Sequence, residues 1–472
     1  MESGELLHRP GPSVGSKPDG RGGWRAASYL IVVGLLERIG FYGVQGNLIM
    51  FLTGPLGMPT ASAAAGVNAW AGTVQVLPLV GALAADSRLG RLPASSASGP
   101  STSAAHLAFI YVALYLLALA QGFHRPCAEA LAADQFTPSD GNPSPRVSRS
   151  SFFNWFHFFI SWGYATSTTV LSYLEDNAGW AVGFGTCWAT MVLCLAVFLL
   201  GARTYRSTEQ PVDDGSPLVA TMSAWARQGA LHLCRLLNRE PDEGKGLWAK
   251  LLPVWLSGMV YASLTSQVYT LFTKQGSTLD RRVGSEGLTV SAAALQCLVS
   301  FTFVTMLPIY DRAFVPVARS VTGHHAGVTT LQRIGAGIAM SCVAMVVAAL
   351  VEGRRLRVAR DAGVYVLMGL AEVLADIGLE EFFYDQVPDA LRSVGLALSL
   401  SALGAGSYAS GMLVSAVDWA TRGGSGESWI SDNLNRAHLG YFYWLLAGLA
   451  TLDVAVFLYF SKRFVYRSKS EL

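Results

Sequence analysis

The sequence predicts an all-α polytopic membrane protein, and three observations support this fold class. Hydrophobic residues make up 51% of the 472 residues, charged residues only 14%, and the mean hydropathy is +0.37. Soluble domains are less apolar, and about 25% of their residues are charged. Apolar segments also recur along the whole chain, each of about the 20 residues that a membrane-crossing helix needs.

Eleven such segments follow one another. They cover residues 26–54, 63–86, 107–130, 153–174, 178–201, 248–272, 287–310, 327–351, 363–384, 390–418 and 439–461. A polar stretch separates the first five from the last six. We therefore expect a cytosolic tail (1–24), an N-terminal helical half (25–202), a cytosolic linker (203–247), a C-terminal helical half (248–463) and a second cytosolic tail (464–472).

The arginine pattern indicates that one span is missing. Short cytosolic loops carry an excess of Lys and Arg. With the N-terminus inside and eleven spans, Arg146 and Arg149 would lie outside, which reverses this bias. One more span between residues 92 and 106 would place them inside with the other basic loop residues, Arg203, Arg206, Arg312, Arg319, Lys462 and Arg463. The run LPASSASGPSTSAAH at that place is too polar to cross a bilayer.

Composition and motifs disfavour several other classes of protein. The net charge is +2, so the chain lacks the basic field that nucleic-acid binding needs. Its six cysteines show no CxxC or Cys/His spacing, and we expect neither a disulfide framework nor a metal site. Neither GxGD nor HExxH occurs, so a membrane-embedded protease is disfavoured. We expect no enzymatic activity and no cofactor.

Five motifs occur in a fixed order between Tyr29 and Tyr466. They are LLERIGFYGVQGNLIMFLTGPLG, GALAADSRLGR, ALAQGFHRPCAEALAADQF, SSFFNWFHFF and GLEEFFYDQVPDALRSVGLALSLS. In this order they resemble the signatures of the proton-coupled oligopeptide transporter family, in particular its plant nitrate/peptide branch. Beyond the first motif, the positions that we single out are Asp86, Arg91, Pro126 and Asn154.

The resemblance implies the major facilitator fold, with twelve helices in two halves and alternating access to a central site. The run between Arg91 and His106 then corresponds to the third helix, so we expect about eleven recognisable spans instead of twelve. The implied function is secondary active transport: proton-coupled uptake or exchange of nitrate, short peptides or a related small anionic metabolite. The expected partners are this solute, protons and the lipid bilayer of the plasma or vacuolar membrane. The alternative is a transport-impaired or receptor-like family member, or an uncoupled facilitator.

The first span carries an adjacent acid and base. A charge within a bilayer is kept where it lines a cavity or has a partner, as we expect for Glu37 and Arg38. Arg38 shares a helix face with Tyr42, so both are candidates for substrate contact. By resemblance, Glu37 matches the second Glu of the family's ExxER motif, which is linked to proton coupling. Gly34 replaces the first Glu, which implies weakened or rerouted coupling; close helix packing is the alternative.

Arg125 stands where the family has a fourth-span Lys, directly before Pro126. Arg is effectively always protonated, so we expect Arg125 to bind an anion rather than transfer a proton. Because a buried charge needs a counter-ion, we expect Glu37 to hold it in the empty state. Pairing with Glu129, one helical turn further on, is the alternative.

Two acids lie one helical turn apart in the late helices. Glu372 matches the family's tenth-span acid, and Asp376 follows on the same face, so the two carboxyl groups can share a proton. Asp376 solvated in a wide cavity is the alternative. We expect Glu380, Glu381 and Asp385 at the cytosolic mouth.

The seventh span, PVWLSGMVYASLTSQVYTLF, contains no His, so a His-based nitrate site of the kind some family members use is not expected there. Tyr261, Gln267 and Tyr269 are the polar candidates for substrate contact in this span, with interfacial or packing roles as the alternative. The lone histidines His124 and His157 are better explained as satisfied helix residues.

We predict that both chain termini are cytosolic in the functional product, because the arginine pattern balances only in that arrangement. A protease-cleavable tag at the C-terminus should be cut in permeabilised cells and protected in intact cells. Cleavage in intact cells would contradict this topology and support an eleven-span molecule.

Overall fold

The computed structural model describes most of the chain, and the statements below concern those residues. They are 22–85, 103–136, 145–206, 241–278, 281–283, 288–322, 328–352, 358–387, 392–422, 428–433 and 437–464.

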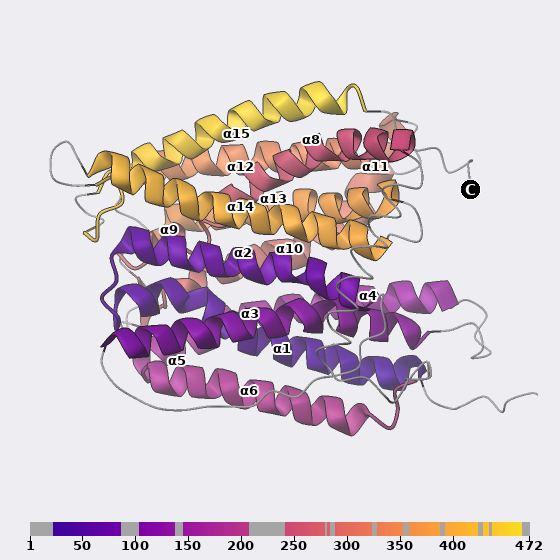
Figure 1. Ribbon diagram of the computed structural model, residues 1–472, viewed down its shortest axis with the longest axis horizontal. Coiled ribbons are helices and arrows are strands. Elements are labelled where there is room, and N and C mark those ends of the chain that lie inside the picture. The colour runs from indigo at the N-terminus through magenta and orange to yellow at the C-terminus, as the bar shows by residue number, and fades with distance from the viewer. Residues whose placement is uncertain are drawn as a thin grey trace, which may run out of the picture.

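Helices form almost all of the described chain, and they run along a common long axis (Figure 1). The first half contains α1 (Gly23–Thr53), α2 (Thr60–Ala85), α3 (Ser103–Asp134), α4 (Pro145–Thr166), a π-helical turn (Ser167–Leu171), α5 (Ser172–Asn177) and α6 (Trp180–Gly201). The second half contains α8 (Pro241–Thr265), α9 (Leu271–Gly276), a 3₁₀ turn (Ala293–Gln296), α10 (Cys297–Ile309), a second π-helical turn (Tyr310–Phe314), α11 (Val315–Thr322), α12 (Thr330–Glu352), α13 (Val358–Gln386), α14 (Arg392–Thr421) and α15 (Leu439–Ser461). A small antiparallel hairpin, β1 (Arg282–Val283) and β2 (Leu288–Thr289), follows α9.

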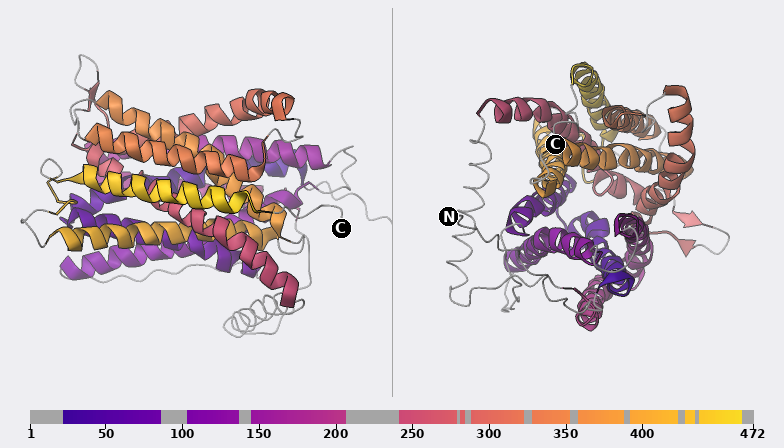
Figure 2. Two further views of the ribbon diagram at one scale, coloured as in Figure 1. Left: turned by 90° about the horizontal axis from the view of Figure 1, so that it is seen from above. Right: turned by 90° about the vertical axis from the view of Figure 1, so that its right-hand side faces the viewer.

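The two ends of the helix bundle can be named from α1. One end, here the Gly23 end, holds the start of α1 and the ends of α2, α6 and α15, on the right of Figure 1. The other, the Thr53 end, holds the end of α1 and the hairpin, on the left. The end-on view in Figure 2 shows the two halves packed side by side.

Helices α2 and α14 form the closest crossing between the halves. A Cβ atom added to Gly72 would lie 2.9 Å from the carbonyl oxygen of Gly404, and one added to Gly404 would lie 2.9 Å from that of Gly72. Paired glycines let two helix backbones approach closely within a membrane. The two backbones therefore approach closely at this crossing, with the side chains of Tyr408 and Val76 packed against the two glycines.

The apolar core is continuous across both halves at the Thr53 end. There, one cluster of buried side chains joins Leu48 and Trp70 of the first half to Val268, Phe272 and Tyr443 of the second. Burial of apolar side chains in one shared cluster stabilises the contact between the halves.

At the Gly23 end the core is divided. One cluster, with Leu331 and Leu379, belongs to the second half, and a separate one, with Phe136 and Phe152, belongs to the first. Among the described residues, the halves thus share an apolar core at one end and keep separate cores at the other.

The span predicted over residues 248–272 is wrong as a continuous helix, because the chain leaves the helix between Thr265 and Leu271. Hydroxyl groups there bond to nearby carbonyl oxygens: Ser266 Oγ to Ala262 O at 2.8 Å and Thr270 Oγ1 to Ser266 O at 3.0 Å. Such local bonds compete with the helical ladder. A broken helix is tolerated in a membrane where protein buries it.

The segment predicted over residues 287–310 also differs. Residues 288–289 form β2, and the helical segment begins at Ala293 and continues through α10 and the π turn to Thr322. By length and composition, six described helices can cross a membrane: Gly23–Thr53, Trp180–Gly201, Ala293–Val321, Thr330–Glu352, Gly395–Thr421 and Leu439–Ser461. Two shorter apolar helices are Ala108–Gly122 and Leu251–Thr265.

The count of eleven spans and the domain boundaries stay predictions. The proposed missing third helix falls on residues 92–106, of which 92–102 lie outside the described chain. Most of the linker and of both tails also lies outside it.

Candidate functional site

Glu37 is buried in the middle of α1, with 5% of its surface exposed. Its Oε2 lies 3.4 Å from Nε of Arg38, and its Oε1 accepts a hydrogen bond of 2.7 Å from Nε2 of Gln121 on α3. A buried carboxylate needs such partners because an unpaired charge in an apolar interior is strongly destabilising. The partners described for Glu37 are therefore a neighbouring cation and an amide donor.

Arg38 is held in place by the packing of α1 against α4. A Cβ atom added to Gly163 of α4 would lie 2.9 Å from Cβ of Arg38 and 2.8 Å from the carbonyl oxygen of Leu35. The guanidinium carbon of Arg38 lies 5.8 Å from the ring centre of Tyr42, within the range of a cation–π contact. Arg38 and Tyr42 thus share a helix face, as the sequence predicts.

A chain of three tyrosine rings crosses from the first half to the second. The ring of Tyr42 meets that of Tyr164 edge to face at 4.4 Å, and Tyr164 meets Tyr269 at 6.4 Å. The Tyr164 hydroxyl donates a hydrogen bond of 3.3 Å to Oε1 of Gln296. The cation on α1 is thereby linked, ring by ring, to the broken segment after α8.

The acid pair of α13 lies at the far end of this chain. Glu372 lies near Asp376 on its own helix and near Tyr164 and Tyr269 of the tyrosine chain. Tyr261 of α8 interacts with both acids. The structure therefore brings together the predicted site residues Arg38, Tyr42, Tyr261, Glu372 and Asp376 around one polar centre; we call these five and Glu37, Tyr164 and Tyr269 the central cluster.

Gln267 lies apart from the central cluster. Its side chain is fully buried, and Nε2 donates to Oγ of Ser410 at 2.8 Å and to the carbonyl oxygen of Ser263 at 3.0 Å. Asn68 of α2 donates to the same Ser410 hydroxyl at 3.0 Å. These contacts favour the packing role that was the alternative for Gln267, because they tie α8, α14 and α2 together.

Polar contacts close the Thr53 end. Nδ2 of Asn47 donates to Oε2 of Glu175 at 3.0 Å and to Oδ1 of Asp176 at 3.3 Å. Arg281, directly before the hairpin, reaches across from the second half, with Nη1 3.8 Å from Oδ2 of Asp176. Lys274 of α9 donates to Oγ1 of Thr53 at 2.8 Å. These contacts reinforce the shared apolar core between the halves.

Gln296 adds a deeper contact between the halves. Its Nε2 donates to the carbonyl oxygen of Gly46 on α1 at 2.8 Å and to Oγ1 of Thr273 at 2.6 Å. Because its Oε1 also accepts from Tyr164, this one side chain connects α1, α4 and α9. The seal at the Thr53 end therefore extends inward to the central cluster.

Gly34 packs directly against α4. A Cβ atom added there would lie 2.6 Å from Cε2 of Phe156. Since real Cβ contacts are not this short, any larger side chain would need the aromatic ring to move. The close packing that was the alternative for Gly34 is therefore present in the structure.

Other predicted site residues cannot be placed in this way. Arg125 and Pro126 lie on α3 and Asn154 on α4, but their side chains are outside the described part of the structure. Asp86 and Arg91 lie outside the described residues altogether. The proposed contact of Arg125 with Glu37 stays a prediction.

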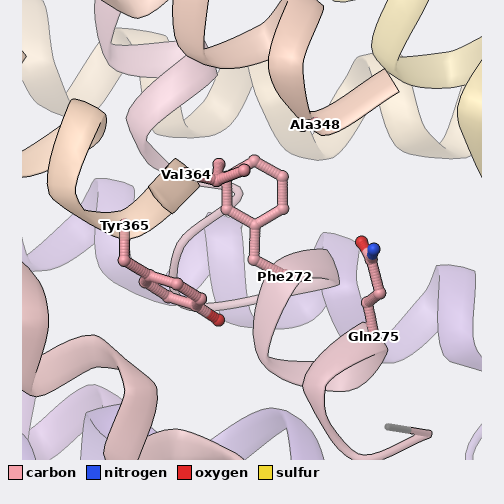
Figure 3. Close-up of a pocket in the computed structure, with 5 residues that line it drawn as sticks. All are labelled: Phe272, Gln275, Ala348, Val364 and Tyr365. Atoms are coloured by element: carbon pink, nitrogen blue, oxygen red, sulfur yellow. The ribbon is translucent and has the colours of Figure 1, made fainter. Parts of the chain in front are cut away.

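A small cavity lies between α9, α12 and α13, near the Thr53 end. Figure 3 shows its lining, with Val364 beside the ring of Phe272 and the amide of Gln275 nearby. Its volume is about 10 Å³, room for about one water molecule, so it is too small for a solute. Gln275 accepts a hydrogen bond of 2.8 Å from the Tyr443 hydroxyl at the same place.

Sequence reasoning missed two residues near the ends of the buried network. Gln121 is an ordinary polar residue in an apolar run, and only the fold shows its contact with Glu37. Arg333 is buried in α12, donates to the carbonyl oxygen of Val373 at 3.0 Å and pairs with Glu381 at 3.4 Å. Its charge within an expected span was a signal that could have identified it.

Comparison with known proteins identifies a family model and close relatives that match most of this chain. A family model described as POT family matches residues 83–235 and 219–430. The Protein NRT1/PTR FAMILY 5.10 of Arabidopsis thaliana is 41% identical over 537 aligned positions, which cover 97% of this chain and 95% of the relative. The Protein NRT1/PTR FAMILY 5.13 of Arabidopsis thaliana is 38% identical and covers 94% of each chain.

Solved structures share the fold at low sequence identity. The crystal structure of an auto inhibited POT family peptide transporter matches with a TM-score of 0.73 and 19% identity, over 94% of this chain and 98% of that chain. A POT family transporter in complex with 5-aminolevulinic acid matches with a TM-score of 0.67 and 14% identity, over 93% and 96% of the two chains.

We predict that Gln121→Leu lowers the thermal stability of the purified protein, because Glu37 loses its amide donor. A buried acceptor left without its partner costs about 1 to 3 kcal/mol. Thermal unfolding of the wild type, Gln121→Leu, Glu37→Leu and the double variant would measure the coupling of the two side chains, because each single variant removes the hydrogen bond. If the two single effects simply add, the hydrogen bond makes no contribution and the prediction fails.

Proposed function

The chain belongs to the POT family of membrane transporters, and we propose that it moves nitrate, a short peptide or a related small anionic metabolite together with protons by alternating access. The family consists of multi-span transporters and not of enzymes. The observation that carries the proposal is the asymmetry of the core around the central cluster. The halves are joined at the Thr53 end and have separate apolar cores at the Gly23 end.

This asymmetry fits one state of an alternating-access cycle. Rocking of the halves would break the contacts at the Thr53 end and bring the two separate cores together at the Gly23 end. The arginine pattern places the Gly23 end in the cytosol, so the described state would be closed toward the outside. A solute would then leave toward the cytosol from the central cluster.

The charges of the central cluster support an anionic solute. Arg38 is a permanent cation whose described ionic partner is Glu37. A proton on Glu37 would weaken that pair and free the guanidinium group for an incoming carboxylate or nitrate. Proton and anion binding would thus favour each other, because each binds more tightly to the state that the other produces.

The acid pair of α13 supports a second proton site. Glu372 and Asp376 lie one helical turn apart on α13, and two carboxyl groups that close can share one proton. Gly34 supplies no acid in the first span, and coupling would therefore depend on Glu37, Glu372 and Asp376. The three tyrosines between them are neutral groups that can reorient with the solute.

One observation favours the alternative, a transport-impaired or uncoupled relative. The alignment with the Arabidopsis relative has 537 positions, more than the 472 residues of this chain, so the relative contains residues that this chain lacks. Their loss from the third helix would weaken packing in the first half. Solute uptake by the expressed chain separates this alternative from the transport proposal.

We predict that cells expressing the chain take up nitrate or dipeptides faster at an outside pH of about 5.5 than at pH 7.5, and that Glu372→Gln removes most of this difference. The variant cannot release a proton from that position and should lose gradient-driven uptake at least tenfold, while solute exchange across the membrane persists. Glu381→Gln, which changes a half-exposed acid paired with Arg333, is the matched control and should keep the pH response.

An unchanged pH response in Glu372→Gln would remove this residue from the coupling mechanism. Absence of uptake for every solute, by wild-type protein that reaches the membrane, would instead support the transport-impaired alternative.

We also predict that separation of the halves at the Thr53 end is required for turnover. In Thr53→Cys/Lys274→Cys, a short bis-methanethiosulfonate reagent should join α1 to α9 through one disulfide at each cysteine and abolish uptake, and a thiol reducing agent should cleave these disulfides and restore it. Each single cysteine variant, treated in the same way, reports on the native cysteines. Full uptake by quantitatively cross-linked protein would exclude an opening at this end.

A further inference from the structure

A cavity of the second half opens on the side of the bundle, and none of its lining residues belongs to the central cluster. It has a volume of about 620 Å³ and lies between α8, α14 and α15, the crossing visible in the left view of Figure 2. Small-molecule sites commonly measure about 300 to 1,000 Å³. The cavity is thus large enough for a small ligand.

The shape of the cavity follows from its side chains. Small residues, Ser257 on α8 and Ala409 on α14, leave room at its floor, and larger apolar residues form its rim. Two rim residues, Leu256 and Leu452, are 44% and 63% exposed. In a spanning bundle such side chains face the hydrocarbon of the bilayer, so the cavity opens laterally into the membrane.

One carboxyl group lies in this otherwise apolar cavity. Asp453 of α15 lines the cavity, only 6% of its surface is exposed, and its Oδ2 has no hydrogen-bond partner among the described residues. The hydroxyl of Ser257 lies within reach of the carboxyl group. An ionisable group inside a membrane helix without an ionic partner indicates a functional site, because its burial is otherwise unfavourable.

The depth of Asp453 limits what can pair with it. It stands eight residues before the end of α15 at Ser461, about 12 Å along the helix at 1.5 Å per residue. Phospholipid head groups lie outside the hydrocarbon core and do not reach this depth. A partner must therefore enter the hydrocarbon with its own donor group, which requires an apolar body.

We propose that this cavity binds a hydrophobic amine from the bilayer, with its ammonium group on Asp453 and Ser257 and its apolar body against Leu256, Leu413 and Leu452. An ammonium group supplies both the missing hydrogen-bond donor and the opposite charge. None of the residues that line the cavity belongs to the central cluster, so this site is separate from the solute site and does not depend on which solute is carried.

The test uses the full chain in phosphatidylcholine nanodiscs and three photoreactive probes with the same dodecyl body. The probes end in a primary amine, a hydroxyl group or a carboxylate. The amine probe should label α8 or α15 saturably, dodecylamine should compete, and the other two probes should bind at least tenfold more weakly. Asp453→Asn should lower the affinity for the amine probe at least tenfold.

Two further variants complete the test. Asp418→Asn changes an acid on α14 that already pairs with Arg422 at 2.8 Å and lies outside the cavity, so it should leave labelling unchanged. Leu256→Trp should fill the cavity and reduce labelling while keeping the carboxyl group, which covers the case that Asp453→Asn does not fold. Equal labelling by the hydroxyl probe, or amine labelling that both cavity variants leave intact, would overturn the proposal.

Discussion

The two halves share one apolar core only at the Thr53 end, and the rest of the described structure depends on this constraint. Leu48 and Trp70 pack with Val268 and Phe272 across the boundary of the halves, whereas the other end contains two separate clusters. Apolar contacts are not directional, so they can be made and broken as units when rigid halves move. Directional bonds, such as those of Gln296, then set the register in which the halves meet.

The buried carboxylate of Glu37 in the first half is stabilised by specific neighbours. Glu37 is held by Arg38 from its own helix and by Gln121 from α3, so its environment depends on the packing of two helices. Gly34 and Gly163 allow α4 to approach α1 closely on the same stretch. The contacts that hold Glu37 and Arg38 are therefore also contacts that pack α1 against α3 and α4. A substitution that changes this helix packing also changes the surroundings of the two charges.

Much of this could be predicted from the sequence, because long apolar runs and isolated charges are strong signals within a membrane protein. The helices, the shared face of Arg38 and Tyr42, and the position of Glu372 next to Asp376 follow from spacing alone. The break after Thr265 could not be predicted, since it lies in an apolar pattern whose hydroxyl groups bond to local carbonyl oxygens as they also do in continuous helices. The partner of Glu37 was missed because Gln121 is 84 residues away in sequence, and only the folded chain brings the two together.

The ion pair of Arg281 and Asp176 makes one contact at the Thr53 end sensitive to the salt concentration of the surrounding solution. Both side chains are part exposed, at 30% and 27%, at the Thr53 end. Dissolved ions screen exposed charges, so this pair weakens as the surrounding solution becomes saltier. The buried contacts beneath it are screened much less. The contact between the halves at this end is therefore sensitive to salt only in its exposed part.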